Sequence, residues 1–175
     1  MTRPPLDVSS KPPYVQETIA LLGSRDPVEV MTETPRWLKA RLGNIAASAW
    51  QTPEAEGKWS LVQVMGHLAD AEMAFGWRAR LVLTTDNALL TGYDQNAWLE
   101  RFNYAGADPE VALDTFLMLR MWNLRVWHTA SDADLGRMAM HADRGPESLE
   151  LLRALIAGHD LRHRRQIERL LKVVS

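Results

Sequence analysis

The sequence predicts an all-α protein in which four main helices, joined by long crossover segments, form a bundle. Three observations predict this class. Apolar residues recur every three or four positions in the long segments, which is the period of an amphipathic helix. Residues that favour helix starts precede these segments, and neither a convincing strand nor a short-period repeat is present. The chain has 175 residues, of which 46% are hydrophobic, enough for one domain with a core.

The first segment of the chain is unsuited to regular structure. Residues 1–13 include four prolines, so we expect a proline-rich tail or strap there and a single domain at residues 14–175. A short helix is expected from about Val15 to Leu22, and Gly23 should end it. These features place a small N-terminal element ahead of the four main helices.

The first main helical region carries two proline signals. Asp26 is a good N-cap residue, and Pro27 suits the first helical position. Pro35 repeats the signal after Thr34. We therefore expect residues 26–50 to form one kinked helix or two helices in sequence.

The second main helix is expected from Ser60 to about Leu83, after a polar turn at residues 51–58. Ser60 and Gln63 have the spacing of a capping box. The core-facing stripe of this helix is Val64, His67, Ala71, Ala74, Arg78 and Leu81.

The two remaining main helices are separated by irregular segments. Residues 84–108 should form a long loop, with a helix near residues 94–102, and Pro109 should begin the third main helix. A second irregular stretch ends near Arg144, and Gly145–Pro146–Glu147 is expected to open the last helix. The stripe of that helix is Leu152, Ile156, His159, His163, Gln166 and Leu170.

The composition excludes several classes of site and partner. The formal net charge is −2 and the basic residues are scattered, which argues against nucleic-acid binding. The chain has no Cys, so a disulfide framework, a cysteine nucleophile and a thiolate metal site are excluded. We expect a cytoplasmic protein that has no signal peptide and does not span a membrane.

Three histidines are candidates for one metal site. His159 and His163 are four residues apart, so their imidazoles project from one side of a helix. His67 lies in the core-facing stripe of another helix. A shared divalent metal would satisfy ring nitrogens that are costly to bury unpaired, and three imidazoles with an open position suit zinc, nickel, iron or manganese. The alternative is three separate core histidines with local hydrogen bonds.

Several polar side chains near these histidines are candidates for a substrate pocket or for catalysis. Arg78 and Arg120 interrupt apolar stripes, and each needs a carboxylate or an anionic ligand; an internal ion pair with Asp70 or Glu72 is the favoured interpretation. Asp70 is also a candidate general base near the metal, although an ordinary salt bridge explains it equally well. Gln166 is either a ligand donor or a partner of a core neighbour.

The other histidines and one tryptophan complete the candidates. His128 is expected at a helix end and His141 in a loop, and neither is expected to bind the metal. Trp98, in the long loop, is a candidate pocket residue.

At these residues the sequence resembles the DinB/YfiT-like metalloenzyme superfamily. The resemblance rests on the segments GKWSLVQVMGHLADAEM and HADRGPESLELLRALIAGHDLRHRRQI, with GYDQNAW and FNY between them. It covers the chain from about residue 26 onward. It implies an up-down-down-up four-helix bundle, a metal site at His67, His159 and His163, and a homodimer.

Three functions are open from the sequence. The first is a metal-dependent S-transferase that activates a low-molecular-weight thiol, as some members of the family do, for transfer to an electrophile. The second is a metal-dependent hydrolase, and the third is a non-catalytic protein that binds a metal or small ligand in a stress response. Zinc or nickel is the expected ion, with iron or manganese as alternatives.

Overall fold

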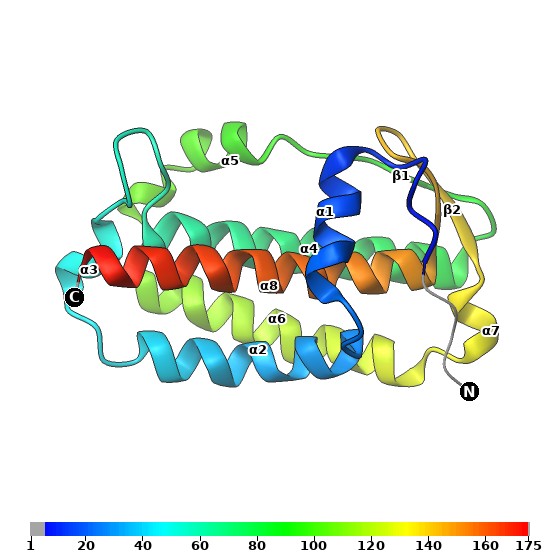
Figure 1. Cartoon of the computed structure of the whole chain (residues 1–175), viewed down its shortest axis with the longest axis horizontal. Coiled ribbons are helices and arrows are strands. Elements are labelled where there is room, and N and C mark those ends of the chain that lie inside the picture. Colours follow the sequence, from blue (N-terminus) through cyan, green and yellow to red (C-terminus); the bar gives the residue numbers. More distant parts are fainter. Residues whose placement is uncertain (1–5, 175) are drawn as a thin grey trace.

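Four long helices form a bundle in the computed structural model, which describes residues 6–174 (Figure 1). The colour gradient shows that two of them run in one direction and two in the other, so the chain order is up-down-down-up. This confirms the fold that the sequence and its family resemblance predict. The four are α2 (Pro27–Leu42), α4 (Leu61–Thr84), α6 (Pro109–Thr129) and α8 (Leu149–Val173).

Side-chain caps fix the starts of these helices. The carboxylates of Asp26 and Asp108 each accept two backbone N–H groups of the first turn, and Ser60 forms the expected capping box with Gln63. The prediction that the last helix begins at Gly145–Pro146–Glu147 is wrong, because these residues lie in a strand. Ser148 caps α8 instead, because its hydroxyl accepts the backbone N–H of Leu151 at 3.1 Å.

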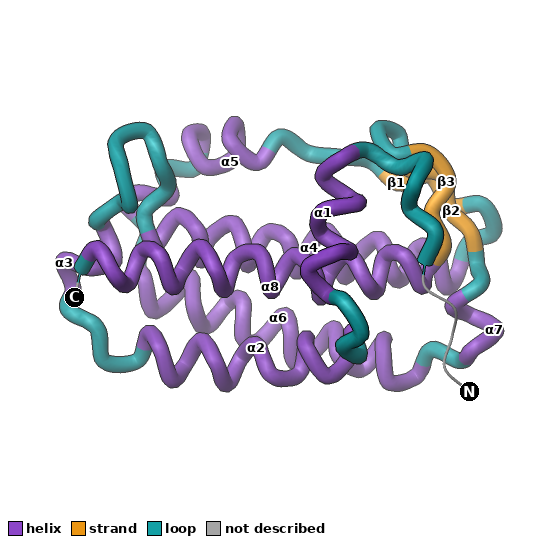
Figure 2. The backbone as a smooth tube through the Cα atoms, in the orientation of Figure 1, coloured by secondary structure: helices purple, strands orange, loops and turns teal. Residues whose placement is uncertain are grey.

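A small three-stranded sheet closes one end of the bundle, which corrects the expectation of no strands (orange in Figure 2). Its strands are β1 (Ala88–Leu90), β2 (Met138–His141) and β3 (Gly145–Ser148). β1 pairs with β2 in parallel, and β2 pairs with β3 as an antiparallel hairpin. The parallel pair joins segments about fifty residues apart, so no local pattern could reveal it.

Helix α2 runs through Pro35, and the separate short helix α3 (Ala47–Gln51) follows it. Proline has no backbone N–H, so the Met31 carbonyl one turn earlier lacks its helical donor. Arg120 of α6 supplies a replacement, because its Nη1 donates to Met31 O at 3.0 Å. Pro35 thus leaves a backbone carbonyl of α2 free to accept a hydrogen bond from a side chain of α6.

Shorter elements cover the bundle. Helix α1 (Pro13–Leu22) crosses α8, and the approach is so close that a Cβ on Gly158 would clash with the Thr18 carbonyl (Figure 1). The tail extends as far as Pro12; residues 1–5 lie outside the described residues, and Lys11 Nζ donates to Arg144 O at 3.1 Å. The crossover segments contain α5 (Gln95–Arg101), the 3-10 turn η1 (Tyr104–Gly106) and α7 (Asp132–Leu135).

A polar layer separates two apolar clusters inside the bundle. One cluster includes Leu38, Leu61 and Phe116, and the other includes Met31, Val82 and Leu152. Buried polar residues lie between the two clusters along α4, α6 and α8, and they are His67, Glu72, Arg120, Asn123, His159, Asp160 and His163. No described helix is long and apolar enough to cross a membrane.

Candidate metal centre

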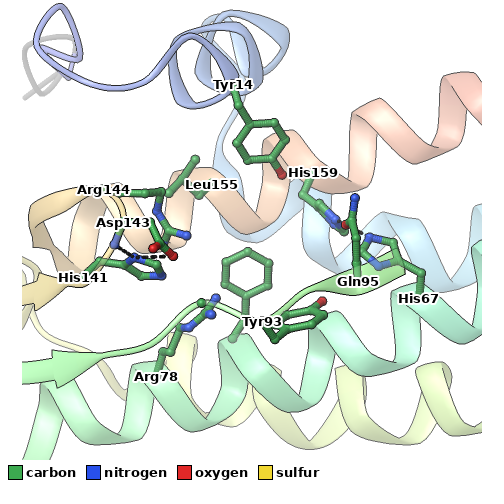
Figure 3. A pocket seen from close by; sticks show the side chains of 12 residues that line it. Tyr14, His67, Arg78, Tyr93, Gln95, His141, Asp143, Arg144, Leu155 and His159 are labelled. Carbon is green, nitrogen blue, oxygen red and sulfur yellow. Dashed lines mark hydrogen bonds and ion pairs between the residues drawn. The ribbon is translucent and has the colours of Figure 1, made fainter. Parts of the chain in front are cut away.

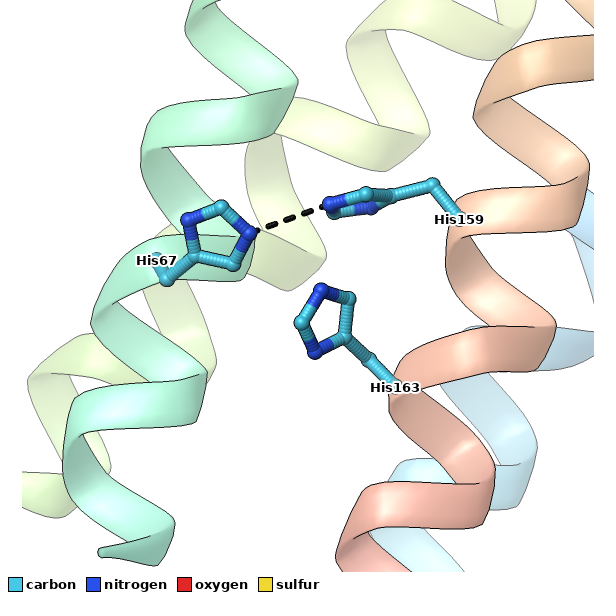
Figure 4. Close-up of side chains that lie close together, drawn as sticks. All are labelled: His67, His159 and His163. Atoms are coloured by element: carbon cyan, nitrogen blue, oxygen red, sulfur yellow. Dashed lines mark hydrogen bonds between the residues drawn. The ribbon is translucent and has the colours of Figure 1, made fainter. Parts of the chain in front are cut away.

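Three buried histidines from two helices face one another (Figure 4). His67 comes from α4, and His159 and His163 lie one turn apart on α8; their exposed fractions are 2%, 5% and 7%. Nε2 of His67 lies 3.0 Å from Nε2 of His159. Each ring offers one nitrogen to the group, and these three nitrogens lie within 4.8 Å of one another. The structure therefore brings together the three residues that the sequence resemblance marks as ligands.

The three imidazoles are neutral near pH 7. Burial lowers the pKa of His67 to about 3, with a further contribution from His163, and burial lowers the pKa of His163 to about 4. The pKa of His159 lies well below 6.5, because of burial and then the neighbouring His163 and His67. Neutral imidazole is the form that binds metals.

Gln166 selects the tautomer of one ligand candidate. The His163 Nδ1 and Gln166 Oε1 lie 2.8 Å apart, and the amide oxygen can only accept, so Nδ1–H donates. The Nε2 lone pair of His163 is then left free for an ion. Gln166, predicted as a pocket or core partner, acts in the structure as the partner of a histidine.

The donor set fits a divalent first-row ion. Zinc–nitrogen bonds of about 2.0–2.1 Å in a tetrahedral site place neighbouring ligand nitrogens about 3.3 Å apart. The observed 3.0 Å between His67 and His159 is close to that spacing. The nitrogen of His67 that faces the other rings is Nε2, and the contact printed for it is to the equally neutral His159 ring. Within the described residues, the group of candidate ligands consists of these three histidines and contains no carboxylate. An ion that prefers four ligands would therefore have one position left for a water or a substrate atom.

Lowering the pH should destabilise the metal-free protein from pH 6.5 down to about 4. Histidines of the unfolded chain take up protons near pH 6.5, whereas the folded pKa values of His67 and His163 are about 3 and about 4. Below pH 6.5 the unfolded state binds more protons, so the free energy of unfolding falls as the pH falls. The slope should approach about 1.4 kcal/mol per pH unit for each buried histidine.

Urea unfolding in the presence of a chelator, at several pH values between about 7.5 and 5, measures this slope. His159→Ala removes one contributing group and should reduce the slope. His128→Ala, at an exposed position of α6, is the matched control and should leave it unchanged. A free energy of unfolding that stays constant below pH 6.5 would contradict the assignment of buried neutral histidines.

A cavity of about 280 Å³ adjoins the histidines (Figure 3). His67 and His159 line it, together with Tyr14 of α1 and Tyr93 of the segment between β1 and α5. Burial raises the pKa of Tyr14, and it raises that of Tyr93 to about 12 with help from the Asp70 carboxylate. Both phenols therefore keep their protons and can donate hydrogen bonds to a ligand. His163 and Gln166 line a second, more open groove beside Arg162.

Arg120 lies outside this cavity and joins all four main helices. From α6 its guanidinium donates to both oxygens of Asp160 on α8, at 2.5 and 2.8 Å, and to Glu72 of α4 at 2.8 Å. A fourth bond reaches Met31 of α2. Burial alone would lower the pKa of Arg120, but the two carboxylates raise it overall. Of the two interpretations from sequence, the structure favours the internal ion pair, with Glu72 as one expected partner.

The remaining sequence candidates occupy different places. Arg78 lines the cavity and donates from Nη2 to Thr91 O at 2.5 Å. The Asp70 carboxylate accepts the Tyr104 hydroxyl at 2.7 Å and is not among the cavity-lining residues. Trp98 packs against Tyr93, with ring centroids 4.4 Å apart, and lines a smaller cavity shared with Arg78.

One histidine outside the metal centre lies where the sequence did not predict it. His141, expected in a loop, lies in β2, is 1% exposed and lines the cavity beside Arg144. Burial alternates along β2, but the sequence does not show this alternation, because the outward residues Met138 and Met140 are apolar as well. Tyr14, Tyr93 and Gln95, which also line the cavity, carried no local signal.

Residues 31–167 match the family model of the DinB superfamily. The chain belongs to the DinB superfamily. A relative of this DinB-superfamily protein is the "Putative metal-dependent hydrolase YfiT" of Bacillus subtilis (strain 168), 31% identical over 66% of this chain and 65% of the relative. The "Putative metal-dependent hydrolase OB0782" of Oceanobacillus iheyensis is 26% identical over 83% of this chain and 84% of the relative.

A solved structure agrees with the fold of this DinB-superfamily protein. It is YfiT from Bacillus subtilis, described as a probable metal-dependent hydrolase with an unusual four-helix bundle topology. The two share a TM-score of 0.77 and 29% sequence identity, over 83% of this chain and 84% of the other.

Proposed function

We propose that this protein is a metal-dependent hydrolase whose ion is held by His67, His159 and His163. One observation carries the proposal: three buried, neutral imidazoles meet within 4.8 Å at the side of a cavity that two of them line. Three protein ligands and one open position are typical of catalytic rather than structural sites. The names of the two relatives support hydrolysis over the other reactions considered.

The parts of the site have separable tasks. Zinc or nickel, with iron or manganese as alternatives, would supply Lewis-acid activation of water and of a carbonyl group. Gln166 holds His163 in the tautomer that a metal needs. The hydroxyls of Tyr14 and Tyr93 face the cavity and can donate hydrogen bonds to a substrate oxygen.

Two other functions were expected from the sequence. A thiol-dependent S-transferase would use the same ion, but the relatives' names give it no support. A closed, structural metal site would need a fourth protein ligand, and within the described residues the group contains three.

The decisive experiment assays a panel of small esters and amides with protein reconstituted with each candidate ion. We expect hydrolysis that a chelator abolishes and that added metal restores. A parallel assay offers a small-molecule thiol and an electrophile. Conjugate formation without hydrolysis would overturn the proposal in favour of the transferase. Inactivity in both assays, with a stoichiometric metal present, would overturn it in favour of a binding protein.

A further inference from the structure

The cavity has a second functional end, opposite the histidines. In Figure 3, Arg78, His141 and Arg144 lie on one side, and His67 and His159 lie on the other. Arg78 is 6% exposed, and its one hydrogen bond within residues 6–174 goes to Thr91 O. No carboxylate of the described residues lies within 4.0 Å of its guanidinium. A buried guanidinium without an acidic partner is costly unless a ligand supplies one.

His141 presents a second unpaired donor. The backbone N–H of Asp143 donates to His141 Nδ1 at 3.1 Å, so the neutral ring carries its proton on Nε2. That Nε2 is buried and has no hydrogen-bond partner among the described residues. Burial and the nearby Arg144 lower the pKa of His141 to about 4, so the ring is neutral near pH 7. The group that would satisfy it is therefore a hydrogen-bond acceptor.

The other charges nearby act on Arg78 only at longer range: burial and Arg144 oppose its charged form and lower its pKa, whereas Glu147 and Asp143 favour that form. Arg144 is engaged by both oxygens of Glu147, at 2.5 and 2.8 Å, so that pair is close to neutral. Asp143 also lines the cavity, but its side chain is 71% exposed and lies on the Nδ1 side of His141, 3.9 Å away. The buried part of this end thus combines one unpaired positive charge with one unpaired N–H donor.

We propose that Arg78 and the Nε2–H of His141 bind a carboxylate group of the substrate. One carboxylate has two oxygens and one negative charge, which match a guanidinium and a neutral N–H donor. The acyl group to be cleaved would lie toward His67 and His159. The substrate class is thus an ester or amide that carries a separate carboxylate. The carboxylate subsite rests on the proposed function only for this last step, because binding of the anion does not need the metal.

Calorimetric titration of the metal-free protein tests the subsite without interference from the ion. The probes are glutaramate, which has one carboxylate and one amide, glutaramide, which is neutral, and inorganic phosphate. We expect glutaramate to bind, and glutaramide to bind at least about tenfold more weakly. In glutaramide a neutral amide takes the place of the carboxylate, so the charge-assisted hydrogen bond to Arg78 is lost. Phosphate that binds more tightly than glutaramate would overturn the carboxylate assignment.

Variants locate the bound carboxylate. Arg78→Met should weaken glutaramate binding about tenfold to hundredfold, and Arg78→Lys, which keeps the charge but loses the planar fork, should give a smaller loss. His141→Phe removes the Nε2–H and keeps a ring, and it should also weaken binding. Arg101→Met, on the exposed surface of α5, removes an equal charge and should leave affinity unchanged. Equal affinities in folded Arg78→Met and wild-type protein would overturn the inference.

The subsite and the proposed function fail separately. Glutaramate binding that depends on Arg78, in a protein that hydrolyses no ester or amide when loaded with metal, would leave the subsite standing and refute the hydrolase. Hydrolysis without preference for carboxylate-bearing esters, together with no glutaramate binding, would support the hydrolase and refute the carboxylate subsite. Should Arg78→Met fail to fold, Arg78→Lys and His141→Phe carry the test.

Discussion

His159→Ala should abolish stoichiometric metal binding. Wild-type protein reconstituted with zinc or nickel is expected to retain about one ion per chain, because three neutral imidazoles converge on one position. The variant keeps two of the three ligands. Even the loss of a residue that merely orients a ligand weakens metal affinity about 10- to 100-fold, so the loss of a ligand itself should exceed that. Elemental analysis after gel filtration, with a competition titration for affinity, gives the measurement.

Two further variants sharpen this metal test. His128→Ala removes an exposed histidine at the end of α6 and should retain the full metal content. Gln166→Leu removes the acceptor that holds His163 Nδ1–H and should weaken binding by about 10- to 100-fold without abolishing it. Equal metal content in wild-type and His159→Ala protein, or none in the wild type after reconstitution, would refute the three-histidine centre.

Arg120→Met should destabilise the fold by about 3–5 kcal/mol. The change leaves the carboxylates of Glu72 and Asp160 buried in the bundle without their shared cation. It also removes the donor to Met31 O, the carbonyl that Pro35 leaves without a helical partner. Urea unfolding of the metal-free protein near pH 7 would report the change in the free energy of unfolding.

An exposed ion pair provides the comparison for Arg120. Arg169→Met breaks the pair with Glu54 on the surface, where Arg169 is 57% exposed, and should cost less than about 1 kcal/mol. Asp160→Asn is a milder change in the buried network, and it keeps the measurement available if Arg120→Met does not fold. If Arg120→Met and Arg169→Met were equally stable and Arg120→Met bound substrate more weakly, Arg120 would be a pocket residue and not a structural one.

Local chemistry predicted the main helices well. The caps at Asp26, Ser60 and Asp108 act on the next few residues, so their effect is written within one turn of sequence. The start of α8 was misplaced because Gly145–Pro146–Glu147 looks like a helix start in isolation. Pairing of β3 with β2 holds those residues in a strand, and Ser148 then begins the helix.

The sequence by itself determined the helical class, the starts of α2, α4 and α6, and the candidacy of three histidines on two helical stripes. Helical periodicity is local, so it assigned His159 and His163 to one face before any tertiary contact was known. Only the tertiary structure decided which buried charges meet. It paired Arg120 with Asp160, left Arg78 without a carboxylate partner among the described residues, and carried His141 on a strand into the cavity. Partners about forty residues apart or more are chosen by how the helices and strands pack, and that choice leaves no periodic trace in the sequence.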